Sequence, residues 1–406
     1  MKNINNLILI LFSGLWFSVS ALGLGNDVGV GARALSFAGN HTAVVNDISA
    51  TYWNPAALAF LPVREFQITL DGSRTYGESD VWGQNITGVK MSDYDNRIRL
   101  GSIGFMSAIP TVQGGLTLAA AYENPYTFDD FLIYNNSTTK EENFAEGGLN
   151  NWSASFGVQV AKGLSAGATI SLITGTERAT FLCEGICWYD EDEDMYYFGA
   201  DTSKQDWKYM GFGLRTGLLY IPMENLKLGA QISTPQNIRF KTKKTVDGRL
   251  YRALSGAFGA GVKLPWMTVA LDGRFTMPYT FTLSSDERIP ASSQAKYFKL
   301  GGGLGLEVPL SMVPVVLRGG YSYDEYDLFS RVLKYDDVPI NWEHGGYSVD
   351  KNRHTITAGV GIFTSGTGLE FSYGYQTWAL AYEQDNYKEK HNYSAHRAAV
   401  AFIVRY

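Results

Sequence analysis

Charged side chains recur inside otherwise apolar stretches of this sequence, and their types permit two kinds of interaction. An arginine guanidinium can hold a carboxylate through two parallel hydrogen bonds, so the cations could bind an acidic ligand. Carboxylates occur in stretches of the same kind, and the mixed signs favour ion pairs among the side chains themselves. We prefer the second interpretation. The cations are Arg215, Arg274, Lys299, Arg318 and Arg397, and the acidic residues include Glu123, Asp272, Glu307 and Glu370.

No residue pattern indicates covalent chemistry or a metal centre. The 5 His residues do not have the spacing of metal ligands. Neither a Gly-x-Ser-x-Gly motif nor a phosphate-binding loop occurs in a suitable setting. The sequence therefore predicts a protein that is not an enzyme and that uses no cofactor and no metal.

Residues 176–205 contain two further groups of interest. Cys183 and Cys187 are the two cysteines of the chain, and in an oxidising compartment we expect them to form a disulfide. Two free thiols are the alternative. The run from Asp190 to Asp194 is entirely acidic and could bind Ca²⁺, although a solvated acidic loop is the commoner explanation.

The composition is that of a β-rich chain. The 406 residues include 44 Gly, 25 Tyr and 22 Phe but only 12 Pro, and 18% of them are charged. A hydrophobic content of 45% is too high for a disordered chain. The formal net charge of −6 gives no indication of nucleic-acid binding.

Residues 1–21 have the features of a secretory signal peptide. Lys2 precedes an apolar run from Leu7 to Val19, and small residues follow as far as Ala21. The run is shorter than the ~20 residues that a transmembrane helix needs. We therefore expect export, with cleavage after Ala21.

The later part of the chain alternates apolar residues with polar residues or glycine. Near the C-terminus, Val400 and Phe402 fall on one face, while Arg397 and Arg405 fall on the other. A period of two residues predicts β-strands. Short connections alternate with long ones between about 14 such segments, which is typical of outer-membrane barrels.

The sequence thus predicts an all-β fold, a transmembrane antiparallel β-barrel of about 14 strands over residues 63–406. Its environment would be the lipid and lipopolysaccharide of the cell outer membrane, and we expect a monomer. A secreted β-sandwich or propeller is the alternative.

Residues 22–62 do not continue the alternation. They are rich in Gly, Ala and Asn, and they include the aromatic residues Phe37, Tyr52 and Trp53. Asn54 precedes Pro55, so a helix should end there. We expect this segment to form a hatch, or plug, inside the lumen; a disordered tail is the alternative.

The stretch from Gly31 to Leu58 resembles the N-terminal hatch of the FadL/TodX family of outer-membrane transporters. The matching residues are Gly31, Ala32 and Arg33 at its start, Asp47 in its middle and Asn54, Pro55 and Ala56 in an Asn-Pro-Ala motif. The chain departs from the family at residues 36–40, where a Gly-Met-Gly-Gly-like run is common. We expect Arg33 and Asp47 to contact the barrel wall.

The resemblance implies passive uptake of hydrophobic compounds such as long-chain fatty acids. A ligand would be captured at the extracellular loops and released through the barrel or its wall. PorV-like proteins have a similar N-terminal start, so a component that docks exported proteins in a secretion system is the alternative. A general porin is disfavoured, because a plugged lumen conducts poorly.

One segment changes phase in its middle. Ile98 and Leu100 lie on one face, whereas Ile103 and Phe105 lie on the other. A phase change beside glycine predicts a β-bulge or kink. An ordinary bulge is the commoner case, and a lateral gap in the wall is the alternative. The gap would comprise Leu100, Gly101, Ser102, Ile103 and Gly104.

Overall fold

The computed structural model describes residues 26–27, 29–83, 86–128, 130–135, 139–190, 195–242, 247–277, 298–325, 347–384 and 387–406. The expected signal peptide lies outside the described residues. The predicted Cys183–Cys187 disulfide and the acidic run 190–194 concern side chains that are also outside them.

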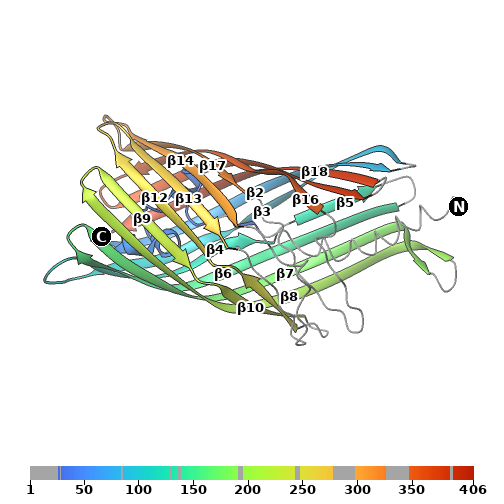
Figure 1. Ribbon diagram of the computed structural model, residues 1–406, viewed down its shortest axis with the longest axis horizontal. Coiled ribbons are helices and arrows are strands. Elements are labelled where there is room, and N and C mark those ends of the chain that lie inside the picture. Colours follow the sequence, from blue (N-terminus) through green and yellow to red (C-terminus); the bar gives the residue numbers. More distant parts are fainter. Residues whose placement is uncertain are drawn as a thin grey trace.

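Antiparallel strands form most of the described chain (Figure 1). Their bounds are β2 (Arg64–Gly83), β3 (Ile86–Ile109), β4 (Leu116–Thr127), β5 (Asp130–Asn135), β6 (Thr139–Ala161), β7 (Leu164–Asp190), β8 (Met195–Met223), β9 (Leu226–Ser233), β10 (Gln236–Thr242), β11 (Asp247–Arg252), β12 (Ser255–Lys263), β13 (Thr268–Thr276), β14 (Lys299–Pro309), β15 (Val315–Asp324), β16 (Tyr347–Phe363), β17 (Thr367–Gln384) and β18 (Tyr387–Arg405).

These strands close into a barrel. Within the described residues, β5, β10 and β11 continue the lines of β4, β9 and β12, so the wall has 14 strands. The last strand, β18, pairs with β2 from Arg405↔Glu65 to Lys388↔Trp82. Closure leaves no strand edge whose backbone groups would meet hydrocarbon unpaired. The predicted barrel of about 14 strands is confirmed.

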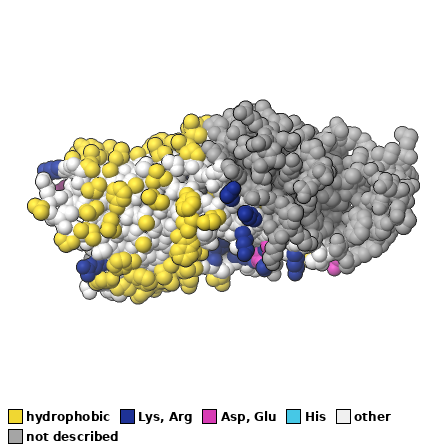
Figure 2. Space-filling model, turned by 90° about the horizontal axis from the view of Figure 1, so that it is seen from below, with side chains coloured by type: hydrophobic (Ala, Val, Ile, Leu, Met, Phe, Trp, Pro, Cys, Tyr) yellow, Lys and Arg dark blue, Asp and Glu magenta, His cyan; other side chains and the backbone are white. Residues whose placement is uncertain are grey.

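The outer face of the wall is apolar and the inner face is not. Ile170 and Phe212 are 63% and 66% exposed, whereas their neighbours Thr169 and Ser171 are buried inside. Leu304 and Phe402 are exposed as well. Figure 2 shows the resulting hydrophobic belt around one side of the barrel. The alternation read from the sequence therefore separates a lipid-facing surface from a polar interior.

The N-terminal segment, defined here as residues 29–62, consists of short helices and turns. Two residues before it form β1 (Asn26–Asp27), which pairs with Tyr126 and Thr127 of β4. The segment's helices are α2 (Ala32–Ser36), α3 (Ala50–Trp53) and the 3₁₀ helix η1 (Pro55–Phe60). No helix among the described residues is long and apolar enough to cross a bilayer.

The chain turns at Asn54 as its position before proline predicts. Helix α3 ends at Trp53, Asn54 is extended with φ −165° and ψ 99°, and Pro55 begins η1. Phe37 and Tyr52 are buried, and Trp53 is partly buried. The segment's aromatic residues therefore pack within the barrel.

Candidate functional site

Inward-facing glycines of the wall make room for the N-terminal segment. Gly157 of β6 pairs with Gly167 of β7, which pairs in turn with Gly217 of β8. A β-carbon on Gly167 would lie 2.4 Å from the carbonyl carbon of Pro55, and one on Gly217 would lie 2.1 Å from Oδ1 of Asn54. Three aligned glycines therefore form a bare patch that seats the Asn-Pro-Ala turn.

A second pair of aligned glycines lies across the barrel. Gly305 of β14 pairs with Gly320 of β15, and added β-carbons there would lie 2.2 and 2.4 Å from atoms of Phe37. Because the two seats are on distant strands, the N-terminal segment spans the interior between them. The glycines that alternate with apolar residues are thus the contact surface of this segment.

The motif residues of the segment hold its turns together. Asn54 accepts a hydrogen bond from the backbone N–H of Ala56 at 3.1 Å, and its side-chain amide donates to the carbonyls of Thr42 and Leu218 at 3.0 and 3.1 Å. Gly31 has a φ of 92°, a conformation that glycine adopts without strain. Ala32 is buried against Ala399 and Ala401 of the wall.

An ion-pair network joins Arg33 to three strands. Arg33 donates to Oε2 of Glu307 at 2.8 Å, and Arg318 donates to the same oxygen at 2.8 Å. Arg318 also contacts Glu370 at 3.0 Å. Each side chain of the network is at most 17% exposed. Arg33 therefore contacts the wall, and Arg318 pairs with carboxylates instead of facing open space.

Among the described residues, Asp47 forms its hydrogen bonds within the N-terminal segment instead of with the wall, contrary to the expectation from the sequence. Its Oδ1 accepts hydrogen bonds from the backbone N–H and the hydroxyl of Ser49. Wall contacts nearby come from other groups, since Glu65 accepts from the N–H of Ile48 at 2.8 Å. A short polar side chain in a turn commonly bonds its own backbone two residues on, and that local bond replaces the expected one.

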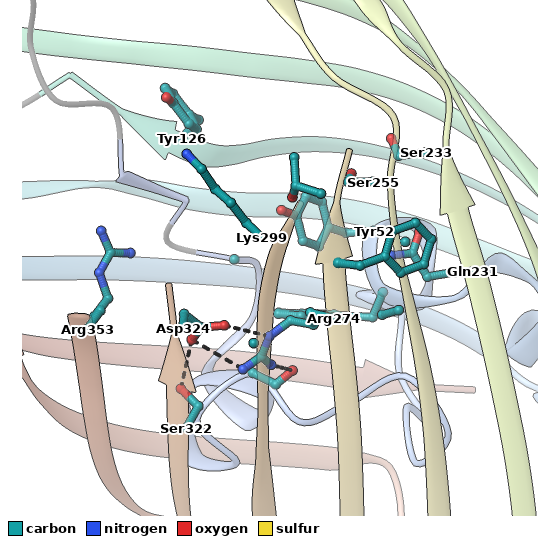
Figure 3. A pocket seen from close by; sticks show the side chains of 18 of the residues that line it. Tyr52, Tyr126, Gln231, Ser233, Ser255, Arg274, Lys299, Ser322, Asp324 and Arg353 are labelled. Carbon is teal, nitrogen blue, oxygen red and sulfur yellow. Dashed lines mark hydrogen bonds and ion pairs between the residues drawn. The ribbon is translucent and has the colours of Figure 1, made fainter. Parts of the chain in front are cut away.

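A cavity of about 310 Å³ lies between the N-terminal segment and the strands around it. Figure 3 shows Arg274, Lys299 and Arg353 reaching it from neighbouring strands, with Tyr52 of the segment at one side. Among the described residues that line it, six are cations and two are carboxylates. The cations are Arg215, Arg252, Arg274, Lys299, Arg353 and Arg397, and the carboxylates are Asp324 and Glu325.

Two of these cations contact the N-terminal segment directly. Arg274 holds Asp324 through two bonds of 2.9 and 3.2 Å, and it donates to the carbonyl of Gly39 at 3.2 Å. Arg215 donates to the carbonyl of Tyr52 and stacks 4.1 Å from the centre of its ring. Both arginines therefore connect the cavity wall to the N-terminal segment.

The structure brings four of the five cations from the sequence into the cavity and places Arg318 in the ion network instead. Arg252 and Arg353 were not identified from the sequence. Arg353 is two residues before Thr355 and four before Thr357, which both face inward, so it lies on the same face of the strand. Extending the alternating pattern to Arg353 would have found it. Arg252 is followed by a break in the strand at residues 253–254, where the period is lost.

The wall is irregular at Gly101. Thr69 pairs with Ser102 and Leu70 pairs with Leu100, so Gly101 is the extra residue of a β-bulge. On the other side of β3, the pairing with β4 runs from Ser102↔Glu123 to Ile109↔Leu116. A β-carbon on Gly101 would lie 2.1 Å from Oδ2 of Asp71. The bulge and the end of the β3–β4 pairing coincide at this point.

Residues 100–104 otherwise belong to the continuous wall on the β2 side. Ile103 pairs with Ile68 and Gly104 pairs with Gln67.

Within the described part of the chain, no group of three or more His, Cys, Asp or Glu residues could hold a metal ion.

Comparison with known proteins finds similar folds among solved structures. No family model and no curated protein sequence matches the chain. Among solved structures, a FadL homologue of Pseudomonas aeruginosa superposes with a TM-score of 0.62 at 12% identity, covering 93% of this chain and 98% of that one. The toluene transporter TodX of P. putida gives 0.61 at 14% identity, covering 94% and 99%.

The toluene transporter TbuX of Ralstonia pickettii is similar as well, with a TM-score of 0.55 at 13% identity and coverage of 94% and 99%. The resemblance to the FadL/TodX family is thus confirmed at the level of the fold over nearly the whole chain.

Proposed function

We propose that this protein is an outer-membrane channel for the passive uptake of hydrophobic compounds that carry an acidic group, such as long-chain fatty acids. The observation that carries the proposal is the cavity, in which six cations face two carboxylates above a lumen occupied by the N-terminal segment. The likeness to the toluene transporters TodX and TbuX supports a hydrophobic ligand, and the preference for an acidic group rests on the cations of the cavity alone.

The cavity offers two kinds of contact to an amphipathic molecule. Its cations supply charge-assisted hydrogen bonds for a carboxylate. Leu35, Tyr52 and Trp53 of the N-terminal segment supply apolar surface in the same cavity, and burying an acyl chain there would contribute ~25 cal/mol per Å². A long-chain fatty acid matches this arrangement better than an uncharged hydrocarbon.

The N-terminal segment would serve as the hatch. It touches strands on opposite sides of the barrel, and its contacts with Gly167 and Gly305 leave no space for even a methyl group at those points. A solute could not pass straight along this part of the lumen. Transport would then need an exit through the wall.

The bulge at Gly101 is the candidate exit. Arg397 lines the cavity and pairs with Ser73 of β2, two positions from Asp71 on the same strand. The carboxylate of Asp71 in turn occupies the space beside Gly101. This arrangement leads from the cavity to the irregular point of the wall, so residues 100–104 remain our proposal for a lateral gap.

The PorV-like alternative would place function in the long connections. A docking component needs no charged interior cavity, and the cation excess in the cavity therefore favours the channel. Two measurements separate the two functions: binding of a fatty acid to the purified protein, and uptake of the fatty acid by cells that carry it.

The binding test compares two probes of the same chain length, a fatty acid and the corresponding fatty alcohol. Wild-type protein should bind the acid more tightly. The double substitution Lys299→Gln with Arg353→Gln should weaken acid binding by about 10-fold or more, since bonds to charged groups contribute roughly 1.5–3 kcal/mol. Alcohol binding should change little.

The substitution Lys162→Gln, in the short turn between β6 and β7, serves as the control, since Lys162 is an exposed cation outside the cavity. Equal affinity of the wild type for acid and alcohol would rule out a head-group site in the cavity. Normal fatty-acid uptake in a strain that lacks the protein, without any gain when it is restored, would rule out the transport function.

A further inference from the structure

A cluster of cations stands on the outer face of the barrel, immediately above the hydrophobic belt. Along β8, Met210 and Phe212 are 56% and 66% exposed and belong to the belt. Lys208 is the next outward position towards the end of the barrel that has the long connections, and it too is exposed. Figure 2 shows Lys and Arg side chains gathered where the belt ends.

The register between β8 and β10 brings like charges together. Lys208 pairs directly with Lys241, and Met210 pairs with Arg239. Phe240, between the two β10 cations, is 1% exposed, so Arg239 and Lys241 share the outer face. Directly opposed like charges destabilise a sheet. An arrangement of this kind calls for an anion.

The described carboxylates on the neighbouring strands are already engaged. Arg178 pairs with Asp206 at 3.0 Å and with Glu146 at 3.2 Å, and Glu146 also pairs with Arg97 at 2.7 Å. In the part of the chain that the structure describes, no carboxylate forms an ion pair with Lys208, Arg239 or Lys241. Asp247 of β11 pairs in register with Lys241, but its side chain lies outside the described residues, so the described side chains supply no anion to this cluster.

We propose that Lys208, Lys241 and Arg239 bind the phosphate groups of a phosphorylated glycolipid headgroup in the outer leaflet. The boundary between an apolar belt and the polar rim is the level at which lipid headgroups lie. A phosphate there bridges the two opposed lysines, Arg239 offers a bidentate fork to it, and the acyl chains lie along Met210 and Phe212.

Two features distinguish this site from a general attraction to anionic membranes. The cations are fixed on paired strands, so their spacing is set by the sheet. They adjoin exposed apolar side chains that only a molecule with acyl chains would cover. The inference depends on the barrel spanning the outer membrane, but not on the solute it carries.

The test measures retention of a defined glycolipid by the full-length protein purified in detergent. The probes are a bisphosphorylated lipid A and the same lipid A after enzymatic removal of both phosphates. Bound lipid is quantified by native mass spectrometry. Wild-type protein should retain the phosphorylated form at least 10-fold better, and high salt should weaken its binding because exposed charges are screened.

The variant is the triple substitution Lys208→Gln, Arg239→Gln and Lys241→Gln. It should bind the phosphorylated lipid no better than the dephosphorylated one. The matched control removes three exposed cations at the opposite rim, with Arg64→Gln, Lys162→Gln and Lys263→Gln, and should behave as wild type. Heat-modifiable migration on gels verifies that each barrel is folded.

Inorganic phosphate added at the concentration of the lipid serves as a third probe. It should not displace the lipid, because it cannot cover Met210 and Phe212. Displacement by inorganic phosphate, equal retention of both lipids by the wild type, or equal loss in the triple variant and the control would each overturn the proposal. Fatty-acid binding in the cavity should be unchanged in the triple variant, so a failure of this site would be distinguishable from a failure of the proposed function.

Discussion

Gly167 and Pro55 meet backbone to backbone: a β-carbon on Gly167 would lie 2.4 Å from the carbonyl carbon of Pro55. The contact joins residues more than one hundred positions apart and leaves no room for a side chain. Gly157 and Gly217 extend the same bare patch to the two adjacent strands. The Asn-Pro-Ala turn is therefore held by the shape of the wall as well as by hydrogen bonds.

We predict that Gly167→Ala displaces the N-terminal segment while the barrel still forms. The new methyl group must push against backbone, which cannot rotate away, whereas alanine is compatible with a strand. Limited proteolysis of the folded protein should cut within residues 29–62, and ion conductance in planar bilayers should rise because the lumen is less completely filled.

The control for this prediction is Gly319→Ala. A β-carbon there would have its nearest neighbour at 3.6 Å, the carbonyl oxygen of Thr357, which is an ordinary contact. This variant should resist protease and conduct as wild type does. Equal behaviour of the two alanine variants would show that the glycine patch does not seat the segment.

The contact between Arg33 and Glu307 should stabilise the segment in the barrel. Arg33→Met leaves Glu307 with Arg318 alone, and removing one partner of a buried ion pair costs about 3–5 kcal/mol. We expect residues 29–62 to lose protease protection at a lower urea concentration, while the barrel keeps its folded migration on gels.

A comparison pair of surface ions calibrates that result. Arg178 pairs with Asp206 at 3.0 Å, with side chains 58% and 41% exposed, and such exposed pairs contribute little to stability because water screens their charges. Arg178→Gln should therefore leave the urea midpoint nearly unchanged. If Arg33→Met shifts the urea midpoint as little as Arg178→Gln does, the buried network does not stabilise the segment.

How much of this architecture can be predicted from the sequence depends on how far apart in the chain the interacting residues are. The strands follow from local alternation, and the bulge at Gly101 follows from the phase change between Leu100 and Ile103. The glycine seats could not be found, because their alignment depends on the register of three separate strands. The partner of Arg33 lies 274 residues away, and nothing local in the chain encodes that pairing.

The candidate site shows the same division. The parity of Arg215 and Arg274 placed them inside, but only the closed barrel shows that they face one cavity with Arg353. The expectation for Asp47 failed in the opposite way, because a local bond to Ser49 displaced the predicted long-range contact. Sequence patterns gave the face of each side chain, and three-dimensional packing selected its partner.

His41 should make the seating of the segment sensitive to acid. It is fully buried between Phe37 and Trp53 at ring distances of 5.5 and 6.2 Å, and neither ring nitrogen has a hydrogen-bond partner in the described structure. Burial, together with the positive charges of Arg33, Arg318 and Lys227, holds the pKa of His41 well below its usual value of 6.5.

The direction of this pH effect follows from the proton that His41 takes up when the N-terminal segment is released from the barrel. The seated segment keeps His41 neutral, whereas the released segment takes up a proton below pH 6.5, so acid favours release. Protection of residues 29–62 should decrease by about 1.4 kcal/mol per pH unit below that value. Its urea midpoint, measured between pH 7.5 and 5, should shift accordingly. His41→Phe keeps an aromatic ring and should reduce this slope; an unchanged slope would assign the effect to other groups.

Deleting Gly101 offers the sharpest test of the proposed exit, because it removes the bulge without moving any other side chain to the opposite face. Leu70 already pairs with Leu100, and Thr69 already pairs with Ser102. The deletion therefore joins two registers that agree and should give an unbroken β2–β3 ladder. If ligands leave the barrel beside Gly101, uptake of a labelled fatty acid by cells should fall by about 10-fold or more, while binding of that acid to the purified protein should persist, since Gly101 does not line the cavity.

Deleting Gly366, in the short turn between β16 and β17, is the control for loss of one glycine elsewhere and should leave uptake intact once folding is verified by gel migration. Wild-type uptake in the Gly101 deletion would mean that the bulge is only a feature of the wall.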